Sequence, residues 1–278
     1  MIIIDYSQIA IANIIGGIEG ELDENGIRHM VLNSIRGYLK RYKKEYGKKV
    51  ILACDGSSCW RKEVFPYYKA NRRKTQANSK YNWEFIYTTM ATIRDELKEW
   101  SPFYVLHFDD CEGDDVIYQM ANDTSEKCLI ISSDKDFVYL HHKPNIKQLS
   151  PITKKMVTYK DPVRTGLELI IRGDSADGVP NILSQDDTFV IGKRQRPLRK
   201  ELVAKWVDLH PDQFCDETTI QYYKRNKTLI DLKSIPALVR VKVLHGYESM
   251  TPASASKFVK YLMMKKATLL INEIGDFF

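Results

Sequence analysis

The stretch that most constrains the fold is residues 128–136, which read Cys-Leu-Ile-Ile-Ser-Ser-Asp-Lys-Asp. Its first half is a short apolar run rich in β-branched residues, which predicts a strand buried on both faces of a sheet. Two aspartates, Asp134 and Asp136, follow where that strand would end. Ligands of open parallel sheets bind just beyond the carboxyl ends of the strands, so both carboxylates would lie at such a site. The alternative at this point is a solvated turn in which Asp134 caps the next helix.

Similar apolar runs alternate with helical hydrophobic patterns through about residue 160. Strand–helix alternation of this kind predicts an α/β fold, with a mostly parallel central sheet that helices cover on both faces. The predicted strands are 2–4, 49–54, 103–108 and 128–131, with weaker ones at 147–150 and 156–159, and the predicted helices include 28–46, 81–100, 116–121 and 162–171. Past about 198, prolines interrupt several short helices. We therefore predict an α/β domain at 1–175 and a smaller all-helical domain at 176–278.

Acidic residues gather where the predicted strands end. Asp5 and Asp55 close the first two strands, and five acids fall within residues 109–115 after the third. Acids favoured in the first turn of a helix explain one or two of these, but not five. The carboxyl ends of parallel strands meet at one edge, and like charges packed there repel unless cations neutralise them. Ligands that offer only oxygen predict a hard cation such as Mg²⁺ or Mn²⁺.

Three further segments have a distinctive composition. Residues 172–180 place Asp174 and Asp177 among glycines, which indicates either a turn or the second half of a two-metal site. Residues 65–80 mix aromatic, basic and amide side chains with poor periodicity. That pattern predicts either a solvated basic helix or loop, or a flexible arch at about 60–82 whose exposed aromatics stack on bases. Residues 193–200 are densely basic, which suits contact with phosphates.

Bulk composition excludes several classes of protein. The start of the chain has no basic segment followed by a long apolar one, so no signal peptide is expected. No apolar stretch approaches the roughly 18 residues that span a membrane. Five cysteines without a Cys-x-x-Cys pair argue against a disulfide framework or a zinc site. We expect a cytoplasmic protein, in the host cytoplasm if the source is a phage.

The net charge bears on the partner. If eight acids gather in one site, setting them aside raises the formal charge of the rest from +6 to +14. A basic body around an acidic pocket suits a polyanion whose phosphates are held while metal ions occupy the pocket. A generally basic protein with no nucleic-acid role is the alternative that charge alone leaves open.

Six segments, in one order along the chain, resemble the phage-type 5′-nucleases of the flap endonuclease superfamily, and within it the RNase H group of T-even bacteriophages. They are D-Y-S-Q-I-A at 5–10, L-N-S-I-R at 32–36, Y-Y-K-A-N-R at 67–72, E-G-D-D at 112–115, I-I-S-S-D-K-D-F at 130–137 and R-G-D-S-A-D-G-V at 172–179. The resemblance weakens after about 180. It implies a PIN/flap-nuclease-like fold and metal-dependent hydrolysis of phosphodiesters near 5′ ends or flap junctions, which removes RNA primers and 5′ flaps during DNA replication.

The resemblance also implies roles for individual residues. A first metal would be held, directly or through water, by Asp5, Asp55, Glu112, Asp114, Asp134 and Asp136, and a second would be served by Asp115, Asp174 and Asp177. Of these acids, Asp134 and Asp136 are expected to act in catalysis together with Lys69 and Arg72, which match the basic pair of the family's arch that positions the scissile phosphate. Nucleic-acid contacts are implied for Arg36, Tyr68, Lys69, Arg72, Arg73, Lys193, Arg194 and Arg196. Two Mg²⁺ ions are the expected cofactors, with Mn²⁺ as a substitute.

Two parts of the C-terminal half bear on partners. Residues 180–185 lack the glycine pattern of the family's helix-turn-helix, so a potassium-type site is in doubt and duplex binding would rest on 193–200. The tail 271–278 resembles a sliding-clamp-binding peptide, or it packs as an apolar end on the body. Expected partners are DNA and RNA–DNA hybrids with 5′ ends or flaps, a sliding clamp and a single-strand-binding protein, for a monomer with no membrane contact. A PIN-type ribonuclease and a non-catalytic structure-specific DNA-binding protein are the alternatives.

Overall fold

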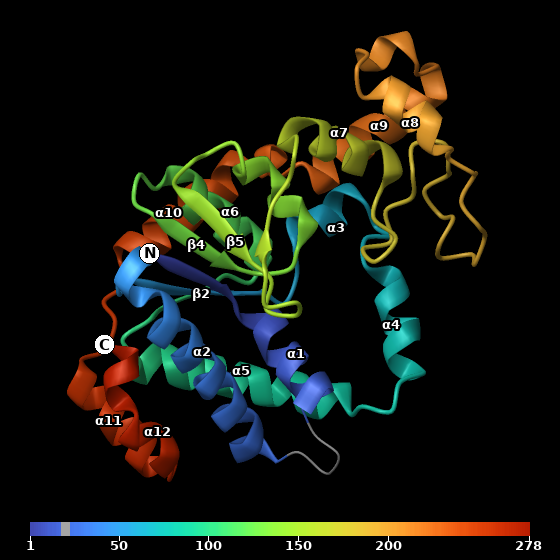
Figure 1. The fold of residues 1–278 in the computed structure, drawn as a ribbon. Helices are drawn as coiled ribbons and strands as arrows, with labels where there is room; N and C mark the ends of the chain where they lie inside the picture. The colour runs from blue at the N-terminus through green and yellow to red at the C-terminus, as the bar shows by residue number, and fades with distance from the viewer. Residues whose placement is uncertain (18–22) are drawn as a thin grey trace.

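A six-stranded sheet forms the centre of the molecule, in the order β3-β2-β1-β4-β5-β6 (Figure 1). The computed structural model describes residues 1–17 and 23–278, and the side chains of residues 73–75 also lie outside the description. The strands are β1 (Ile2–Asp5), β2 (Val50–Cys54), β3 (Tyr104–His107), β4 (Cys128–Ile131), β5 (Ile146–Leu149) and β6 (Met156–Val157). Every pairing is parallel except the last, between β5 and β6. The predicted α/β fold with a mostly parallel sheet is confirmed.

Both faces of the sheet are buried, as the continuous apolar strands require. In β1, Ile2 and Ile4 belong to one hydrophobic core and Ile3 to the other, and all three side chains are fully buried. The first core is covered by α1 (Tyr6–Gly17), α2 (Glu24–Tyr46) and α5 (Trp83–Trp100), and the second by α6 (Gly113–Asp123). Alternate residues of a strand thus hold two layers of helices on one sheet.

The helix predicted at 28–46 begins earlier, at Glu24. The side chain of Asp23 caps it by accepting from the backbone N–H of Gly26 at 2.7 Å. Arg28, one turn after Glu24, is buried and pairs with Glu24 and with Glu96 of α5. The missed first turn contains Asn25 and Gly26, which have low helix propensity, so the pattern marked the start of this helix too late.

The segment expected to expose its aromatics is folded onto the body. It contains α3 (Trp60–Val64) and α4 (Ala70–Ala77), and α4 leads into α5 away from the sheet (Figure 1). Phe65 and Tyr68 are buried, and they pack in one cluster with Val179, Leu229 and Ile230. The expectation of exposed stacking aromatics is therefore wrong for these two residues, because chain from beyond residue 178 covers them.

The C-terminal half is helical, as predicted. Its helices are α7 (Pro162–Arg172), α8 (Lys200–Trp206), α9 (Glu217–Ile230), α10 (Ala237–Glu248), α11 (Ala255–Met264) and α12 (Thr268–Asn272), with short 3₁₀ turns η2 (Pro211–Gln213), η3 (Leu232–Ser234) and η4 (Ile274–Phe277). A further 3₁₀ turn, η1 (Lys135–Leu140), lies between β4 and β5. Residues of α7, α8 and α9 form a separate small cluster.

The last helices pack on the sheet domain. Val239 and Val243 of α10 belong to the core on the α6 side. Phe258 of α11 and Phe277 of η4 belong to the core on the α2 side. Within the described residues, no helix is both long and apolar enough to cross a membrane.

Candidate active site

The acids that follow the strands lie along one rim of the sheet. Strand β1 sits between β2 and β4 with Asp5 opposite Ala53, so the loops after β1, β2 and β4 leave the sheet side by side. Asp5 ends β1, Asp55 follows β2, and Asp134 follows β4. Parallel register therefore converts three distant sequence positions into neighbours.

Asp5 is held in place by two hydrogen bonds. Its Oδ1 accepts from the backbone N–H of Gln8 at 2.9 Å, and its Oδ2 accepts from Ser132 Oγ at 3.0 Å. Burial, and then the nearby charge of Asp55, raise the pKa of Asp5 to about 7. At neutral pH such a carboxyl group is only partly ionised, and a cation that offsets the neighbouring charges favours its charged form.

Asp55 and Glu112 fix the start of α6. Asp55 Oδ1 accepts from the backbone N–H of Gly113 at 2.8 Å, and Glu112 is the N-cap of the helix. A Cβ at Gly113 would lie 3.3 Å from Asp55 Oδ1, so the small residue allows this approach. Asp114, in the first turn, has its pKa raised well above the usual value by burial and then by Asp134 and Asp5. The β3–α6 acids are thus electrostatically linked to those of β1 and β4.

Asp134 and Asp136 begin η1, after β4. Asp134 Oδ1 accepts from the backbone N–H of Asp136 at 2.8 Å, so Asp134 is a cap as well as a rim acid. Burial, then Asp134 and Asp174, raise the pKa of Asp136 well above its usual value. Its Oδ1 is buried and has no hydrogen-bond partner among the described residues. A buried carboxylate oxygen without a donor, surrounded by other oxygens, fits a hard cation.

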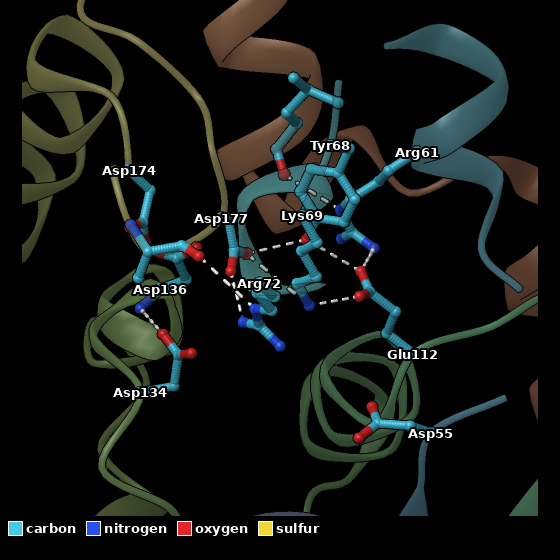
Figure 2. A network of polar contacts seen from close by, with 12 residues as sticks. Asp55, Arg61, Tyr68, Lys69, Arg72, Glu112, Asp134, Asp136, Asp174 and Asp177 are labelled. Atoms are coloured by element: carbon cyan, nitrogen blue, oxygen red, sulfur yellow. Dashed lines mark hydrogen bonds and ion pairs between the residues drawn. The ribbon is translucent and has the colours of Figure 1, made fainter. Parts of the chain in front are cut away.

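Asp174 and Asp177 belong to a tight turn after α7. The backbones of Asp174 and Val179 exchange hydrogen bonds of 2.8 and 2.7 Å, which closes the turn. Gly173 has φ of +69°, and a Cβ there would lie 2.4 Å from the Val179 carbonyl oxygen, so only glycine fits. Lys135 contacts Asp174 at 3.1 Å. Asp174 lies beside Asp136, whereas the carboxylate of Asp177 is turned to Lys69 and Arg72 (Figure 2).

Basic side chains from the start of α4 reach into these acids (Figure 2). Lys69 Nζ contacts Glu112 and lies 3.7 Å from Asp177, and Arg72 contacts Asp177 at 2.6 Å. Burial alone would raise the pKa of Asp177, but Lys69 and Arg72 outweigh it and hold that pKa below its usual value. Lys69 thus lies between two sets of acids, one that includes Glu112 and one that includes Asp177. Within the described residues, no three Asp, Glu, His or Cys side chains are already closed around one metal position.

Asp115, expected near the second metal, is a buried counter-ion instead. It is fully buried, and Arg61 contacts its Oδ1 at 2.9 Å. Its Oδ2 accepts from Trp60 Nε1 at 3.2 Å and from the backbone N–H of Glu112 at 3.0 Å. Arg61 also contacts Glu112 at 2.9 Å. Arg61 was not predicted as a site residue, because nothing in the sequence Trp-Arg-Lys-Glu at 60–63 shows that Arg61, rather than Lys62, is buried.

Tyr68 does not present its ring for stacking on the substrate. Its side chain is buried, and its hydroxyl lies 3.0 Å from Glu112 and 2.9 Å from Asp177. Arg36 lies on α2, within the predicted helix, where it pairs with Asp276 at 2.9 Å and Glu273 at 3.4 Å, and its contact with nucleic acid stays a prediction. Both residues are occupied by partners within the protein.

The remaining predicted nucleic-acid contacts are on the surface. Lys193, Arg194 and Arg196 are exposed, on a loop that Asn181 ties down by a 2.9 Å hydrogen bond to the Arg196 carbonyl oxygen. Their contact with a duplex stays a prediction. The side chain of Arg73 lies outside the described residues.

The C-terminal tail packs on the body in this structure. Phe277 is buried between Phe103 and Phe258, with ring centroids 6.4 and 5.2 Å away. Lys43 Nζ donates to the carbonyl oxygen of Gly275 at 2.7 Å. Of the two interpretations of the tail, the structure favours packing, and clamp binding stays an untested prediction.

A cavity of about 670 Å³ lies beside the acids. Asp55, Glu112, Lys69 and Arg72 line one part of it, and residues of α5 line another. The α5 wall was not predicted, although its residues recur at helical spacing. The cavity therefore joins the predicted site residues to a surface that sequence reasoning assigned to no function.

Two family models match the chain. A family model described as the 5′-3′ exonuclease, N-terminal resolvase-like domain, matches residues 18–166, and one described as T4 RNase H, C terminal, matches residues 165–277. The chain is 32% identical over 289 residues to ribonuclease H of Enterobacteria phage T4, covering 99% of this chain and 95% of that protein. It is 32% identical over 210 residues to an exodeoxyribonuclease of Enterobacteria phage T3, covering 68% and 66% of the two chains.

Solved structures show the same fold. Bacteriophage T5 5′-exonuclease with bound zinc superposes with a TM-score of 0.64 at 15% identity, covering 90% of this chain and 99% of that one. A complex of bacteriophage T5 flap endonuclease with DNA and metal ions gives 0.62 at 15% identity, covering 89% and 99%. The resemblance inferred from the six sequence segments is confirmed. The chain belongs to the 5′-3′ exonuclease family and is a 5′-nuclease whose C-terminal part is of the T4 RNase H type.

Proposed function

We propose that this protein is a divalent-metal-dependent 5′-3′ exonuclease and flap endonuclease that removes RNA primers and 5′ flaps during DNA replication. One observation carries the proposal: carboxylates from five separate segments share one rim, and Lys69 and Arg72 reach into them. The full-length similarity to a phage ribonuclease H, and the shared fold with a flap endonuclease complexed with DNA and metal ions, support the substrate class.

The residues of the rim fit divalent cations of the magnesium type. Their donor atoms are carboxylate oxygens, the pKa values of Asp5, Asp114, Asp134 and Asp136 are raised by burial and then by neighbouring acids, and Asp136 has an unpartnered buried oxygen. Asp5, Asp55, Glu112, Asp114, Asp134 and Asp136 would hold a first ion, and Asp174 and Asp177 would serve a second. We leave Asp115 out of the set, because its fully buried carboxylate is paired with Arg61 and accepts from Trp60 and from the backbone of Glu112.

Bound Mg²⁺ or Mn²⁺ would activate water and offset charge on the phosphate. The role of the protein's own side chains is to position the scissile phosphate next to the acids of the rim. Lys69 and Arg72 are held at that place by Glu112 and Asp177. With cations on those acids, the two basic side chains would be available for the phosphate, where charge-assisted and forked hydrogen bonds would fix its orientation.

The test uses three 5′-labelled substrates: a flapped duplex, a nicked duplex and an RNA–DNA hybrid. Each is incubated with Mg²⁺, with Mn²⁺ and with chelator alone. We expect cleavage of the flap and the hybrid with either metal and none with chelator. Cleavage that persists in chelator would refute a metal-dependent mechanism.

Two variants separate catalysis from binding. Asp134→Asn and Asp55→Asn should abolish cleavage while DNA binding is kept or tightened, because a carboxylate that faces phosphate is removed. Asp212→Asn, at an acid whose side chain is 75% exposed, is the matched control and should behave as wild type. DNA binding without cleavage by the wild-type protein would instead favour a non-catalytic DNA-binding role.

A further inference from the structure

A glutamine side chain is buried inside the sheet next to the rim. Gln148 of β5 is fully buried, and it lies on the same face of the strand as Ile146, a residue of the core on the α6 side. An amide in an apolar core costs free energy unless its polar atoms are hydrogen-bonded. Packing alone favours an aliphatic residue at this position, so the hydrogen bonds of the amide indicate what Gln148 contributes.

The amide of Gln148 holds the loop that follows β4, the strand beside β5 (Figure 1). Its Nε2 donates to the carbonyl oxygen of Ser132 at 2.9 Å and to that of Asp134 at 2.7 Å. Strand β4 ends at Ile131, so both carbonyl groups belong to residues beyond the paired part of the strand. A side chain thus supplies the donors that a longer strand would have found in the backbone of its neighbour.

The remaining polar atom of this amide also has a partner. Gln148 Oε1 lies 2.8 Å from His141 Nε2. Both hydrogens of the Gln148 amide are used by the two carbonyl groups, so Oε1 can only accept and the imidazole must carry a hydrogen on Nε2. The ring of His141 is held in turn by Tyr159, edge to face with centroids 4.7 Å apart. His141 therefore fixes the direction in which the amide of Gln148 faces.

The loop held by Gln148 connects acids that would hold the first ion. Ser132 Oγ donates to Asp5 Oδ2 at 3.0 Å and accepts from the backbone N–H of Asp134 at 3.1 Å. Asp134 Oδ1 in turn accepts from the backbone N–H of Asp136 at 2.8 Å. Because the bonds form one chain, a shift of the two carbonyl groups that Gln148 holds would move all three carboxylates.

We propose that Gln148 is a positioning residue of the rim: its amide, oriented by His141, holds the loop 132–136 in the shape that binds divalent metal. In this role the side chain acts through the backbone of the loop and contacts neither the metal nor the substrate. The proposal rests on the proposed function, in that the acids of the rim are taken to bind divalent cations.

The first measurement is calorimetric titration of the protein with Mn²⁺ in the absence of nucleic acid. Gln148→Met removes the amide but keeps an unbranched side chain that packs adaptably. Replacing a residue that orients metal ligands typically lowers metal affinity about 10- to 100-fold, and we expect a loss of this size for Gln148→Met. Gln119→Met is the matched control, because Gln119 of α6 is 4% exposed and its amide donates to Asp123, an acid outside the rim. The control should bind Mn²⁺ as wild type does.

Two substitutions of His141 test the orientation of the amide. His141→Phe keeps a ring against Tyr159 but removes the donor to Gln148 Oε1, and should weaken Mn²⁺ binding about tenfold. His141→Gln places an amide N–H as many bonds from the backbone as the imidazole Nε2, and should restore wild-type binding. If Gln148→Met does not fold, this pair carries the comparison.

The second measurement is backbone hydrogen–deuterium exchange in chelator, which follows the loop without metal. Peptides that cover residues 132–140 should exchange faster in Gln148→Met than in wild type, because the loop opens more often when its carbonyl groups lose their donor. The same peptides should exchange at the wild-type rate in Gln119→Met. A purely structural role for Gln148 would lower the melting temperature but leave the Mn²⁺ affinity of the folded protein unchanged.

Two results would overturn the proposal: Mn²⁺ affinity of Gln148→Met equal to that of Gln119→Met, or exchange at 132–140 that is the same in both variants. Neither measurement uses nucleic acid. Failure of the nuclease assignment therefore appears separately, as a wild-type protein that binds Mn²⁺ but cuts none of the three labelled substrates.

Discussion

Replacing Asp5 by asparagine removes one charge from the rim and preserves the local hydrogen bonds. Asp5 accepts from Gln8 N–H and from Ser132 Oγ. An amide keeps one carbonyl oxygen for Gln8, and its NH₂ group donates to Ser132 Oγ, whose hydroxyl can rotate to accept. Asp5→Asn therefore isolates the electrostatic cost of gathering acids at the rim in the absence of metal.

The size of the effect follows from the pKa of Asp5, which burial and then Asp55 raise to about 7. The usual value is about 3.9, and each pKa unit corresponds to about 1.4 kcal/mol. The folded state binds more protons than the unfolded state between these values, so stability without metal falls as pH rises from about 4 to 7. Asp5→Asn should therefore raise the free energy of unfolding by at most about 1.5 kcal/mol at pH 5 and about 4 kcal/mol at pH 8.

Urea unfolding in chelator at pH 5 and pH 8 measures this difference. Asp177→Asn is the control of opposite sign, because Lys69 and Arg72 hold the pKa of Asp177 below its usual value against the effect of burial. Its stabilising charge is present above the unfolded pKa, so its removal should destabilise the protein at both pH values. An Asp5→Asn variant that is no more stable than wild type at pH 8, or whose gain does not grow with pH, would refute the reasoning.

Three other perturbations have defined outcomes. Lys69→Ala should slow single-turnover cleavage about 100- to 1,000-fold without unfolding the protein, and a thermal melt beside the rates checks both parts. Arg61→Ala should cost about 3–5 kcal/mol in urea unfolding, because it leaves buried Asp115 without its cation and leaves Glu112 with Lys69 alone; a loss under 1 kcal/mol would mean that the Arg61–Asp115 pair is not desolvated. Phe277→Ala should cost about 3–5 kcal/mol, since its ring is buried against Phe103 and Phe258; unchanged stability would mean that the tail is undocked in solution.

The sequence was most informative where local pattern and topology act together. Buried parallel strands are continuous apolar runs, and every such strand delivers its carboxyl end to the same edge. Asp5, Asp55 and Asp134 could therefore be placed near one another before any coordinates were known. The family resemblance added Lys69 and Arg72, which composition alone would have left in a basic loop.

Long-range pairing decided what the sequence could not show. Tyr68 is buried because its hydroxyl meets Glu112 and Asp177, which lie 44 and 109 positions further along the chain. Asp115 is buried in an ion pair with Arg61, and no sequence pattern around Arg61 predicts that this arginine is buried. Helix α1 was not predicted, because Ile9, Ile11 and Ile14 spread its apolar side chains without a clear stripe.

The packing of the last helices has a consequence for how the protein is made. Gly246 of α10 approaches the Phe108 ring so closely that a Cβ would lie 2.5 Å from it, and Phe258 and Phe277 complete the opposite core. Both layers of the sheet are thus finished by residues that are synthesised after every acid of the rim. A growing chain carries those acids well before it can hold them in place, so nuclease activity should arise only after residues 237–277 have been added.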